Sequence, residues 1–562
     1  MMAISPEPGY PAGMKRAGKH IFLDLLHSEG VDVIFGNPGT TELPLLDAFV
    51  VEDRLRYILG LNEVVVMGMA DGYAQATGRL AVCNLHAAPG LGNAMGMLYN
   101  AARAGAPILV TAGQQDMSIR LTEPLLWDDL ATMARPLCKW SFEVASLAEL
   151  PRAVRRAAKV ALTAPTGPVF LSIPGDVLTA MAGDELDLLA PTRIGPRLRG
   201  DADAIAAAAA LIRASTAPVI FAGDHVARSG AHDELAALAE AIGAPVYLEG
   251  MANTAAFPSN HRLYAGTVAR MTPALRALME QHDLLISIGA DLLTQSQATG
   301  VEALAPGTKV VHLDDEPWQI GKNFAATAAI QGDARATLPE LTVLVADCGA
   351  HRSTAVAAGL AAKKAALFAR ADAMAGDLPL QPMPVLKLIG ELLPDNAIVI
   401  EELLSSGMNT VRQLVPAVAP DSWFGMRGGG IGVAIPQAAG IQIAHPDRPV
   451  VVLSGDGSAL YSIAALWTLA HYKLPVVTVI FNNQSYRILK QRTRAIGGHS
   501  AEADSFVAMD LQDPAIDFMA MAQAHGVAGV RAETLDAVRT AFTTALAADT
   551  PTLIEIIVDR EV

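Results

Sequence analysis

The stretch PVVVLSGDGSALYSIAALWTLAHYKLPVVTVIFNN, which begins at Pro449 and ends at Asn483, most constrains the fold of this chain. An apolar run enters a glycine turn, a segment rich in Ala, Leu and Trp follows, and a second apolar run ends at Asn482. This order predicts strand, helix and strand, the crossover unit of a parallel sheet. Because both strands deliver their carboxyl ends to one edge, we expect Asp456 and Asn483 to lie close together.

The residues at that edge predict a site for a cation and a phosphate. The carboxylate of Asp456 and the side-chain carbonyl of Asn483 are hard oxygen ligands that suit Mg²⁺ or Ca²⁺. The small turn residues Gly455, Gly457 and Ser458 leave backbone N–H groups free to face a phosphate at the start of a helix. A metal there could bridge the protein to a diphosphate.

Apolar runs alternate with helical segments along the rest of the chain, which predicts an α/β protein with three doubly wound parallel sheets. The runs taken as strands are VDVIFG, YILGL, LAVCNL, PILVTAG and PVFLSIP, then PVIFAG, PVYLEG, LLISIG and KVVHLD, then AIVIEE and PTLIEIIV. The expected organisation is a disordered lead-in over 1–14, domains over 15–184 and 199–344, an Ala-rich linker over 345–382 and a third domain over 383–562.

Composition narrows the class of protein. The 562 residues are 52% hydrophobic and 17% charged, and no apolar run approaches the roughly 20 residues that span a bilayer. The net charge of −16 argues against nucleic acid and anionic membranes as partners. The N-terminus lacks the apolar core of a secretory signal, and the three cysteines follow no metal-ligand spacing. We expect a soluble, cytoplasmic protein.

Four motifs together carry a resemblance to a known family. They are NPGTTELP, LNEVVVMGMADGYAQATG, NLHAAPGLGNAMG and the GDGS–NN pair described above. The chain resembles the thiamine diphosphate-dependent 2-oxo acid decarboxylases of the acetolactate synthase-like superfamily, and benzoylformate decarboxylases in particular. The resemblance implies a pyrimidine-binding domain, a Rossmann-like middle domain and a diphosphate-binding domain. It also implies thiamine diphosphate with Mg²⁺ or Ca²⁺ as cofactors.

The resemblance assigns residues to the cofactor. It makes Asp456, Asn483 and the backbone carbonyl of Ser485 the metal ligands. Gly429 would offer its carbonyl to the 4′-amino group, and Ile431 would wedge the two rings into a bent conformation, against the alternative of a flexible glycine-rich loop. The other implied cofactor contacts are Pro38, Gly39, Leu404, Ser405, Gly455, Gly457, Ser458 and Tyr486.

Glu63 is the first catalytic candidate. It begins a helix rich in Val, Met and Ala, which would bury it and favour its neutral form. The resemblance implies that it contacts N1′ of the aminopyrimidine and promotes the imino tautomer. The alternative is an ordinary solvated residue favoured by the helix dipole.

His86 follows an apolar strand at the sheet edge where general acid–base residues collect, and the resemblance makes it catalytic. A satisfied core or surface histidine is the alternative. Thr40 stands where benzoylformate decarboxylases have Ser, and its hydroxyl would donate to the substrate carboxylate. Thr41 is a second candidate for that donation, and turn or cap roles are the alternative for both.

The middle region departs from the family. Benzoylformate decarboxylases carry a second catalytic His there, but no histidine lies between His282 and His312, and Ser296 aligns with the missing residue. The same region has no glycine fingerprint after a strand, so FAD is not expected.

The predicted substrate cavity also departs from the family. Ile488 and Leu489 fall at wall positions, while Gly425 and Arg492 align with aromatic wall positions. Arg427, with the neighbouring Arg487, adds cationic character, which suggests an anion at the far end of the substrate. Side chains that point to solvent or pair with acidic residues are the alternative.

The resulting functional prediction is non-oxidative decarboxylation of a 2-oxo acid to an aldehyde. The alternatives are a carboligase or lyase that forms or cleaves 2-hydroxy ketones, and a binding protein without chemistry. Because family members share each cofactor between two subunits, we expect a homodimer, paired into a homotetramer.

Overall fold

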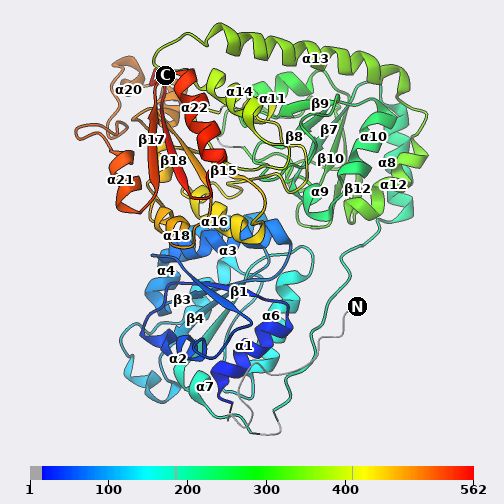
Figure 1. Cartoon of the computed structure of the whole chain (residues 1–562). Helices are drawn as coiled ribbons and strands as arrows, with labels where there is room; N and C mark the ends of the chain where they lie inside the picture. Colours follow the sequence, from blue (N-terminus) through cyan, green and yellow to red (C-terminus); the bar gives the residue numbers. More distant parts are fainter. Residues whose placement is uncertain (1–15, 184–185, 296, 408, 562) are drawn as a thin grey trace. The chain divides into compact units, whose positions relative to one another are not determined.

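The computed structural model describes residues 16–183, 186–295, 297–407 and 409–561. Three six-stranded sheets form the core, and every strand pairing is parallel (Figure 1). This confirms the predicted α/β class with three doubly wound sheets. The predicted lead-in over 1–14 lies outside the described residues. Among the residues that are described, no helix combines the length and the apolar character needed to cross a membrane.

The chain forms two compact units, and the first contains one sheet. Unit 1 comprises the chain up to Ile194, together with Arg427–Pro446 and Ser462–Leu474. The sheet order is β2-β1-β3-β4-β6-β5, and the central strands are buried along their whole length, as expected for strands covered on both faces. The strands are β1 Val33–Gly36, β2 Arg56–Leu59, β3 Ala81–Leu85, β4 Ile108–Gln114, β5 Ser141–Glu143 and β6 Val169–Pro174. The helices are α1 Gly18–Ser28, α2 Leu43–Ala48, α3 Glu63–Thr77, α4 Ala87–Ala104, α5 Leu130–Ala134, α6 Leu150–Leu162 and α7 Gly175–Thr179, and the short 3-10 turn η1 spans Thr40–Glu42.

Helix α3 packs directly against α16 (Ala434–Ala444), which also belongs to unit 1 (Figure 1). The contact is so close that a Cβ atom on Gly72 would lie 2.3 Å from the carbonyl oxygen of Gln437. A Cβ atom on Gly440 would likewise lie 2.0 Å from the carbonyl oxygen of Met69. The buried Asp71 closes the contact by accepting hydrogen bonds from Gln75 and, at 2.7 Å, from Gln437. Small residues therefore set the spacing of the two backbones.

We expect Gly72→Val to destabilise the protein, because the added side chain must push two main chains apart. Overpacking of this kind typically costs about 1–3 kcal/mol. Urea unfolding of wild type and variant measures the loss. Gly359→Ala is the matched control, since Gly359 is an exposed helical residue with no atom within 4 Å of an added Cβ. The control should be neutral or slightly stabilising, and equal stability of Gly72→Val and wild type would contradict the packing argument.

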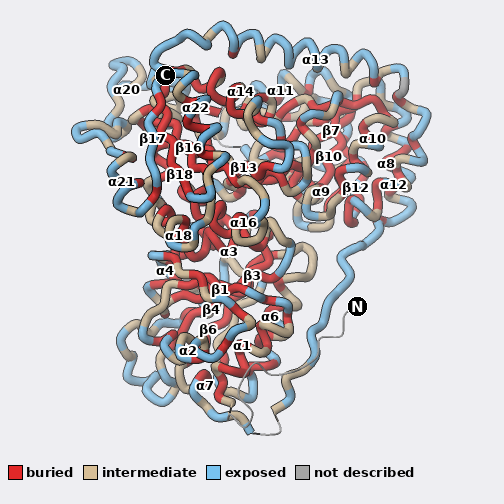
Figure 2. The backbone as a smooth tube through the Cα atoms, in the orientation of Figure 1, coloured by how far each residue is buried: buried red, intermediate tan, exposed pale blue. Residues whose placement is uncertain are grey.

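The middle sheet belongs to unit 2, which comprises Gly195–Met426, Asp447–Tyr461 and the chain from Pro475 onward. Its order is β12-β11-β10-β7-β8-β9. Helix α13 (Ala350–Ala373) follows this region and is mostly exposed, whereas the strands beside it are buried (Figure 2). The strands are β7 Pro218–Ala222, β8 Val246–Leu248, β9 Tyr264–Thr267, β10 Leu284–Ile288, β11 Lys309–Asp314 and β12 Ala328–Gln331. The helices are α8 Ala202–Ala214, α9 Asp224–Ser229, α10 His232–Ile242, α11 Thr272–Met279 and α12 Ala334–Leu344.

The third sheet, also in unit 2, has the order β14-β13-β15-β16-β18-β17. Strands β15 and β16 are adjacent, with Gly455 paired to Phe481, as the crossover unit predicts. The single helix expected between them is instead two short helices, α17 (Asp456–Ala459) and α18 (Ala465–His471). The strands are β13 Ile398–Glu402, β14 Trp423–Gly425, β15 Val450–Gly455, β16 Val477–Asn482, β17 Ala528–Ala532 and β18 Thr552–Ile557. The remaining helices are α14 Pro382–Leu392, α15 Val411–Leu414, α19 Arg487–Ile496, α20 His499–Glu502, α21 Phe518–Ala524 and α22 Leu535–Leu546.

Candidate active site

A buried carboxylate, Glu42, organises the candidate residues at the carboxyl ends of β1 and β3. Its oxygens accept hydrogen bonds from the backbone N–H groups of Gly39 and Gly113, each at 2.9 Å, and from the Thr41 hydroxyl at 2.7 Å. The same carboxylate lies 2.9 Å from Nδ1 of His86. Groups from four residues therefore hold this one carboxylate in place. The sequence analysis named Thr40 and Thr41 but not Glu42.

This arrangement orients the His86 ring. An acceptor-only carboxylate at Nδ1 assigns the proton to that nitrogen and leaves Nε2 for other partners. The Thr41 hydroxyl is also 3.2 Å from Nδ1. Close approach of the backbone requires glycine here, because a Cβ on Gly39 would lie 2.0 Å from Nδ1. His86 caps α4 and its side chain is one-quarter exposed, so the ring can reach a ligand. Thr40 is exposed.

Glu63 begins α3 and is buried, as the sequence analysis expected. Asn62 caps the helix by accepting from the N–H of Val65, which places Glu63 in the first turn. The Asn93 amide donates to Glu63 Oε2 at 3.1 Å, and a Cβ on Gly90 would lie 3.1 Å from Oε1. The carboxyl group is therefore enclosed, with one side-chain donor in contact.

Asp456 lies at the other candidate centre, in unit 2, immediately after β15. Its Oδ2 is buried and has no hydrogen-bond partner. Burial raises the pKa of Asp456 to about 6, and the nearby backbone N–H groups of Gly457, Gln484 and Ser485 oppose that rise. Since these groups belong to the two predicted turns, the structure brings the glycine turn and the Asn-Asn end of β16 together.

The neighbours of Asp456 form a compact turn. Asn483 Oδ1 accepts from the N–H of Ser485 at 3.0 Å, and Asn483 Nδ2 is 3.5 Å from the hydroxyl of Ser405. The Tyr486 ring covers Gly457 so closely that a Cβ there would lie 2.7 Å from the ring. The predicted metal ligands and four predicted cofactor residues, Gly457, Ser405, Tyr486 and the adjoining buried Ser458, therefore share one region of unit 2.

Of the remaining predicted cofactor residues, Gly455 ends β15 and the others lie in loops. Gly429 has a φ of +82°, a left-handed conformation that favours glycine, and it is exposed. Beside it, Gly430 exchanges two hydrogen bonds with the side chain of Asn100, at 2.7 and 2.9 Å. Ile431 and Pro38 are half-buried, and Gly455 caps α17. Leu404 lines a cavity described below.

The predicted pocket residues fall into two groups. Gly425 and Leu404 line one cavity in unit 2, and Ile488 and Arg492 are both half-buried on α19, one helical turn apart. Leu489, on the same helix, is 46% exposed. The other group comprises Arg427, which is buried in unit 1, and Ser296, which lies outside the described residues.

Comparison with protein-family models and known proteins identifies the family. Models described as the N-terminal TPP binding domain, the central domain and the C-terminal TPP binding domain of thiamine pyrophosphate enzymes match residues 16–131, 205–341 and 405–556. The chain is 34% identical over 535 residues to a benzoylformate decarboxylase of Pseudomonas aeruginosa, covering 95% of this chain and 97% of that protein. The chain belongs to the thiamine diphosphate-dependent decarboxylase family. It is an enzyme of that family, as the motifs predicted.

Other relatives of this thiamine diphosphate enzyme extend the comparison. An acetolactate synthase large subunit of Parasynechococcus marenigrum is 31% identical, with 97% of this chain and 88% of that protein covered. The solved thiamine diphosphate-dependent 4-hydroxybenzoylformate decarboxylase of Rhodococcus jostii superposes with a TM-score of 0.86 at 32% identity, covering 97% of this chain and all of that chain. A benzoylformate decarboxylase from Polynucleobacter necessarius gives 0.88 at 30% identity, covering 97% and 99%.

The residues around Asp456 suit the charged tail of thiamine diphosphate. The buried Asp456 Oδ2 lacks a partner, and an oxygen in that condition is stabilised by a cation. Asn483 adds a side-chain carbonyl, and the glycines of the turn expose backbone N–H groups without a side chain in the way. The donor set is all oxygen, which matches Mg²⁺ or Ca²⁺ better than a softer metal. The protein therefore has the groups that a cation-bound diphosphate requires.

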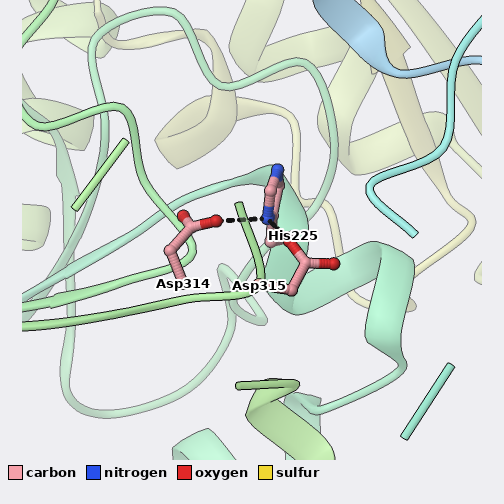
Figure 3. A group of neighbouring side chains, drawn as sticks. All are labelled: His225, Asp314 and Asp315. Carbon is pink, nitrogen blue, oxygen red and sulfur yellow. Dashed lines mark ion pairs between the residues drawn. The ribbon is translucent and has the colours of Figure 1, made fainter. Parts of the chain in front are cut away.

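A second cluster of titratable residues lies in the middle domain, at the carboxyl ends of β7 and β11 (Figure 3). His225 Nδ1 is 2.8 Å from Asp314 Oδ1 and also pairs with Asp315, and Figure 3 shows both carboxyl groups directed at the ring. Burial raises the pKa of Asp314 to about 8, and the charge of Asp315 acts in the same direction. Burial also raises the pKa of Asp315. The pair therefore retains a proton near neutral pH.

We expect the cluster of His225, Asp314 and Asp315 to lower the free energy of unfolding as the pH rises from about 4 to about 8. The folded protein holds a proton on Asp314 that the unfolded chain releases near pH 4, so raising the pH favours unfolding by up to about 1.4 kcal/mol per pH unit. His225, His312 and Arg228 also act on Asp314 or Asp315 and moderate the slope. Urea unfolding between pH 5 and 8 measures it, and Asp314→Asn should flatten it. The exposed Asp549→Asn is the control. An unchanged slope in Asp314→Asn would contradict the assignment.

Proposed function

We propose that this enzyme catalyses non-oxidative decarboxylation of a 2-oxo acid to an aldehyde, using thiamine diphosphate and Mg²⁺. The observation that carries the proposal is the group formed by His86, Glu42 and Thr41. Glu42 holds the His86 ring through Nδ1 while the side chain stays one-quarter exposed, which suits an oriented general acid–base residue. The relationship to benzoylformate decarboxylases supports the same reaction.

Each residue has a defined part in this proposal. Asp456, Asn483 and the backbone carbonyl of Ser485 would hold the cation. When bound, thiamine diphosphate supplies the nucleophilic carbon and the electron sink that decarboxylation requires. The enclosed Glu63 carboxyl would hold or release a proton beside a ring nitrogen of the bound cofactor. Thr40, which is exposed, would donate to the substrate carboxylate, and His86 would deliver a proton from Nε2.

The test is incubation of the purified protein with thiamine diphosphate, Mg²⁺ and a panel of 2-oxo acids, with CO₂ and organic products measured. Carbon dioxide with equimolar free aldehyde is the expected result. Carbon dioxide with only a coupled hydroxyketone would replace the proposal with the carboligase alternative, which the acetolactate synthase relatives favour. If thiamine diphosphate binds but no substrate gives a product, the chain is a binding protein without chemistry and the proposal is overturned.

We further infer that the active enzyme is a homodimer, or a tetramer made of two such dimers, with Glu63 of one subunit and Asp456 of its neighbour serving one cofactor. This arrangement is the one implied by the family. Co-expression of Glu63→Gln and Asp456→Ala chains tests it, because a mixed dimer would then contain one site with both changes and one intact site. Activity in the mixed dimer, with neither parent active, is expected. Inactive mixed dimers would place each site within a single chain.

A further inference from the structure

A cavity of about 100 Å³ lies in unit 2, where strands of two sheets end. Its lining includes Leu404 and Gly425, which are candidate cofactor and substrate residues, and Met251, Arg270 and Glu401, which the sequence analysis did not name. These residues lie at the carboxyl ends of β13 and β14 or in the loops that follow β8, β9 and β13, so the cavity collects the carboxyl ends of parallel strands. Ligands of α/β proteins bind at such edges.

Arg270 projects a guanidinium group at this cavity with few of its donors used. Its Nη1 donates to the sulfur of Met251 at 3.1 Å. Its aliphatic stem lies over Gly250, where a Cβ would be 2.8 Å from Arg270 Cγ. A thioether is a weak acceptor, and a guanidinium group has five N–H donors in a planar fork. Within the described part of the chain, the Met251 contact therefore leaves several N–H groups of the guanidinium available to a ligand.

Arg492 of α19 brings a second guanidinium group to the segment that carries Arg270. Its Nη1 contacts the sulfur of Met271, the residue next to Arg270. Burial lowers the pKa of Arg270, the nearby positive charge of Arg492 lowers it further, and the carboxylate of Glu401 acts in the opposite direction. Among the described residues, no carboxylate oxygen lies within the 4.0 Å ion-pair distance of either guanidinium. Two like charges thus converge without an anion in contact.

The other charged residues that line the cavity are Arg412, Glu401 and Glu402, and among the described residues none of them forms an ion pair with Arg270 or Arg492. Arg412 donates to the carbonyl oxygens of Thr254 and, at 2.6 Å, of Ala252, and it lies over the Trp423 ring, so its role is structural. Glu401 accepts from the N–H of Leu403 at 2.9 Å, and burial raises its pKa, which Arg412 and Arg270 oppose. Glu402, which also lines the cavity, is buried. Arg270 and Arg492 therefore retain capacity for an external anion.

We propose that Arg270 and Arg492 bind a carboxylate at the end of the substrate that is remote from its 2-oxo acid group. The proposal rests on the 2-oxo acid chemistry proposed above and narrows its substrate class to 2-oxo dicarboxylic acids. Planar guanidinium forks match a carboxylate and bind it through paired charge-assisted hydrogen bonds. Gly425 stands where the resemblance expects an aromatic wall, so this position offers no ring against which an aromatic substrate could stack.

The reacting carboxylate is a poor partner for these arginines on chemical grounds. As CO₂ leaves, negative charge moves from the carboxylate to the adjoining carbon. Two cations on that carboxylate would stabilise the starting state more than the transition state and would slow the step. A remote carboxylate keeps its charge throughout, so its attraction to Arg270 and Arg492 lowers KM without opposing the reaction.

The test compares 2-oxo acids that differ only in the remote carboxylate, with the enzyme loaded with thiamine diphosphate and Mg²⁺. The pairs are 2-oxoglutarate with 2-oxopentanoate and 2-oxoadipate with 2-oxohexanoate. We expect each dicarboxylate to have the higher kcat/KM, by at least about 10-fold. Arg270→Gln and Arg492→Gln should each raise KM for the dicarboxylate about 10- to 100-fold with little change in kcat, as expected when an interaction of equal strength in ground and transition states is removed. Their effect on the monocarboxylates should be small.

Arg494→Gln is the matched control. Arg494 lies two residues along α19, is exposed, and pairs with Asp504 at 2.7 Å, so its loss should leave both substrate series unchanged. Equal or better turnover of monocarboxylates by wild type, with the arginine variants unaffected, would overturn the inference.

Calorimetric binding of unreactive glutarate and butyrate separates this inference from the proposed function. Selective glutarate binding that both arginine variants lose, without turnover of any 2-oxo acid, would uphold the anion site and remove the decarboxylase assignment. Turnover of 2-oxo acids without glutarate selectivity would remove the anion site and uphold the decarboxylase assignment.

Discussion

Glu63→Gln is expected to lower kcat/KM roughly 10²–10⁴-fold for every 2-oxo acid that the enzyme accepts, the range typical for loss of one positioned proton-transfer group. Glutamine keeps the shape of the side chain and can still accept the hydrogen bond from Asn93. It cannot hold or release a proton at that position. The limited space around Oε1, set by the backbone near Gly90, makes this nearly isosteric change the appropriate one.

Two measurements separate a chemical defect from a structural one. Thermal unfolding and thiamine diphosphate titration of Glu63→Gln should stay close to wild type while turnover is lost. The control is Glu533→Gln, which changes an exposed carboxylate and should retain full activity. Wild-type turnover in Glu63→Gln would remove Glu63 from the proton-transfer chemistry.

The second large effect is expected at Asp456. Asp456→Ala should weaken Mg²⁺-dependent retention of thiamine diphosphate by roughly 100-fold or more, since even supporting residues of metal sites contribute 10- to 100-fold. The cofactor-free protein should lose little stability. In the cofactor-free protein the buried Oδ2 of Asp456 lacks a partner among the described residues, and burial raises the pKa of this carboxyl group. Removal of the Asp456 carboxyl group therefore relieves a desolvation cost.

Calorimetry with and without EDTA measures this effect. Chelation of the metal should bring wild type to the affinity of Asp456→Ala and should leave the variant unchanged. Asp549→Ala, at an exposed carboxylate, is the control. Full cofactor affinity in Asp456→Ala with Mg²⁺ present would show that the cation is held elsewhere.

The strands that the sequence analysis found and those it missed differ in position. It predicted the central strands, where Val, Ile and Leu run together because both faces are covered. It missed five strands, all at sheet edges, where exposure breaks the apolar run or the strand is too short to register. The missed strands are β5, β9, β12, β14 and β17.

The residues of the candidate site also differ in whether the sequence alone could predict them. Motifs with fixed spacing led to Asp456 and Asn483, because a glycine turn and paired asparagines can be recognised without knowledge of tertiary contacts. Glu42 lies inside a quoted motif, yet its role depends on Gly113 and His86, which reach it only in the folded chain. Arg270 belongs to no motif. Only the missing acceptors around its guanidinium group, which are a property of the packed structure, draw attention to it.

The glycine contact between α3 and α16 has a consequence for tolerance to variation. Glu63 and Gly72 belong to the same helix, about 14 Å apart at 1.5 Å per residue. An α-helix transmits a shift along its axis almost undiminished. The main-chain contact at Gly72 therefore governs the position of the Glu63 carboxyl group along that axis. Remote substitutions that displace α3 by a fraction of an ångström should therefore impair turnover before they impair folding, and libraries aimed at new substrates should leave this helix pair untouched.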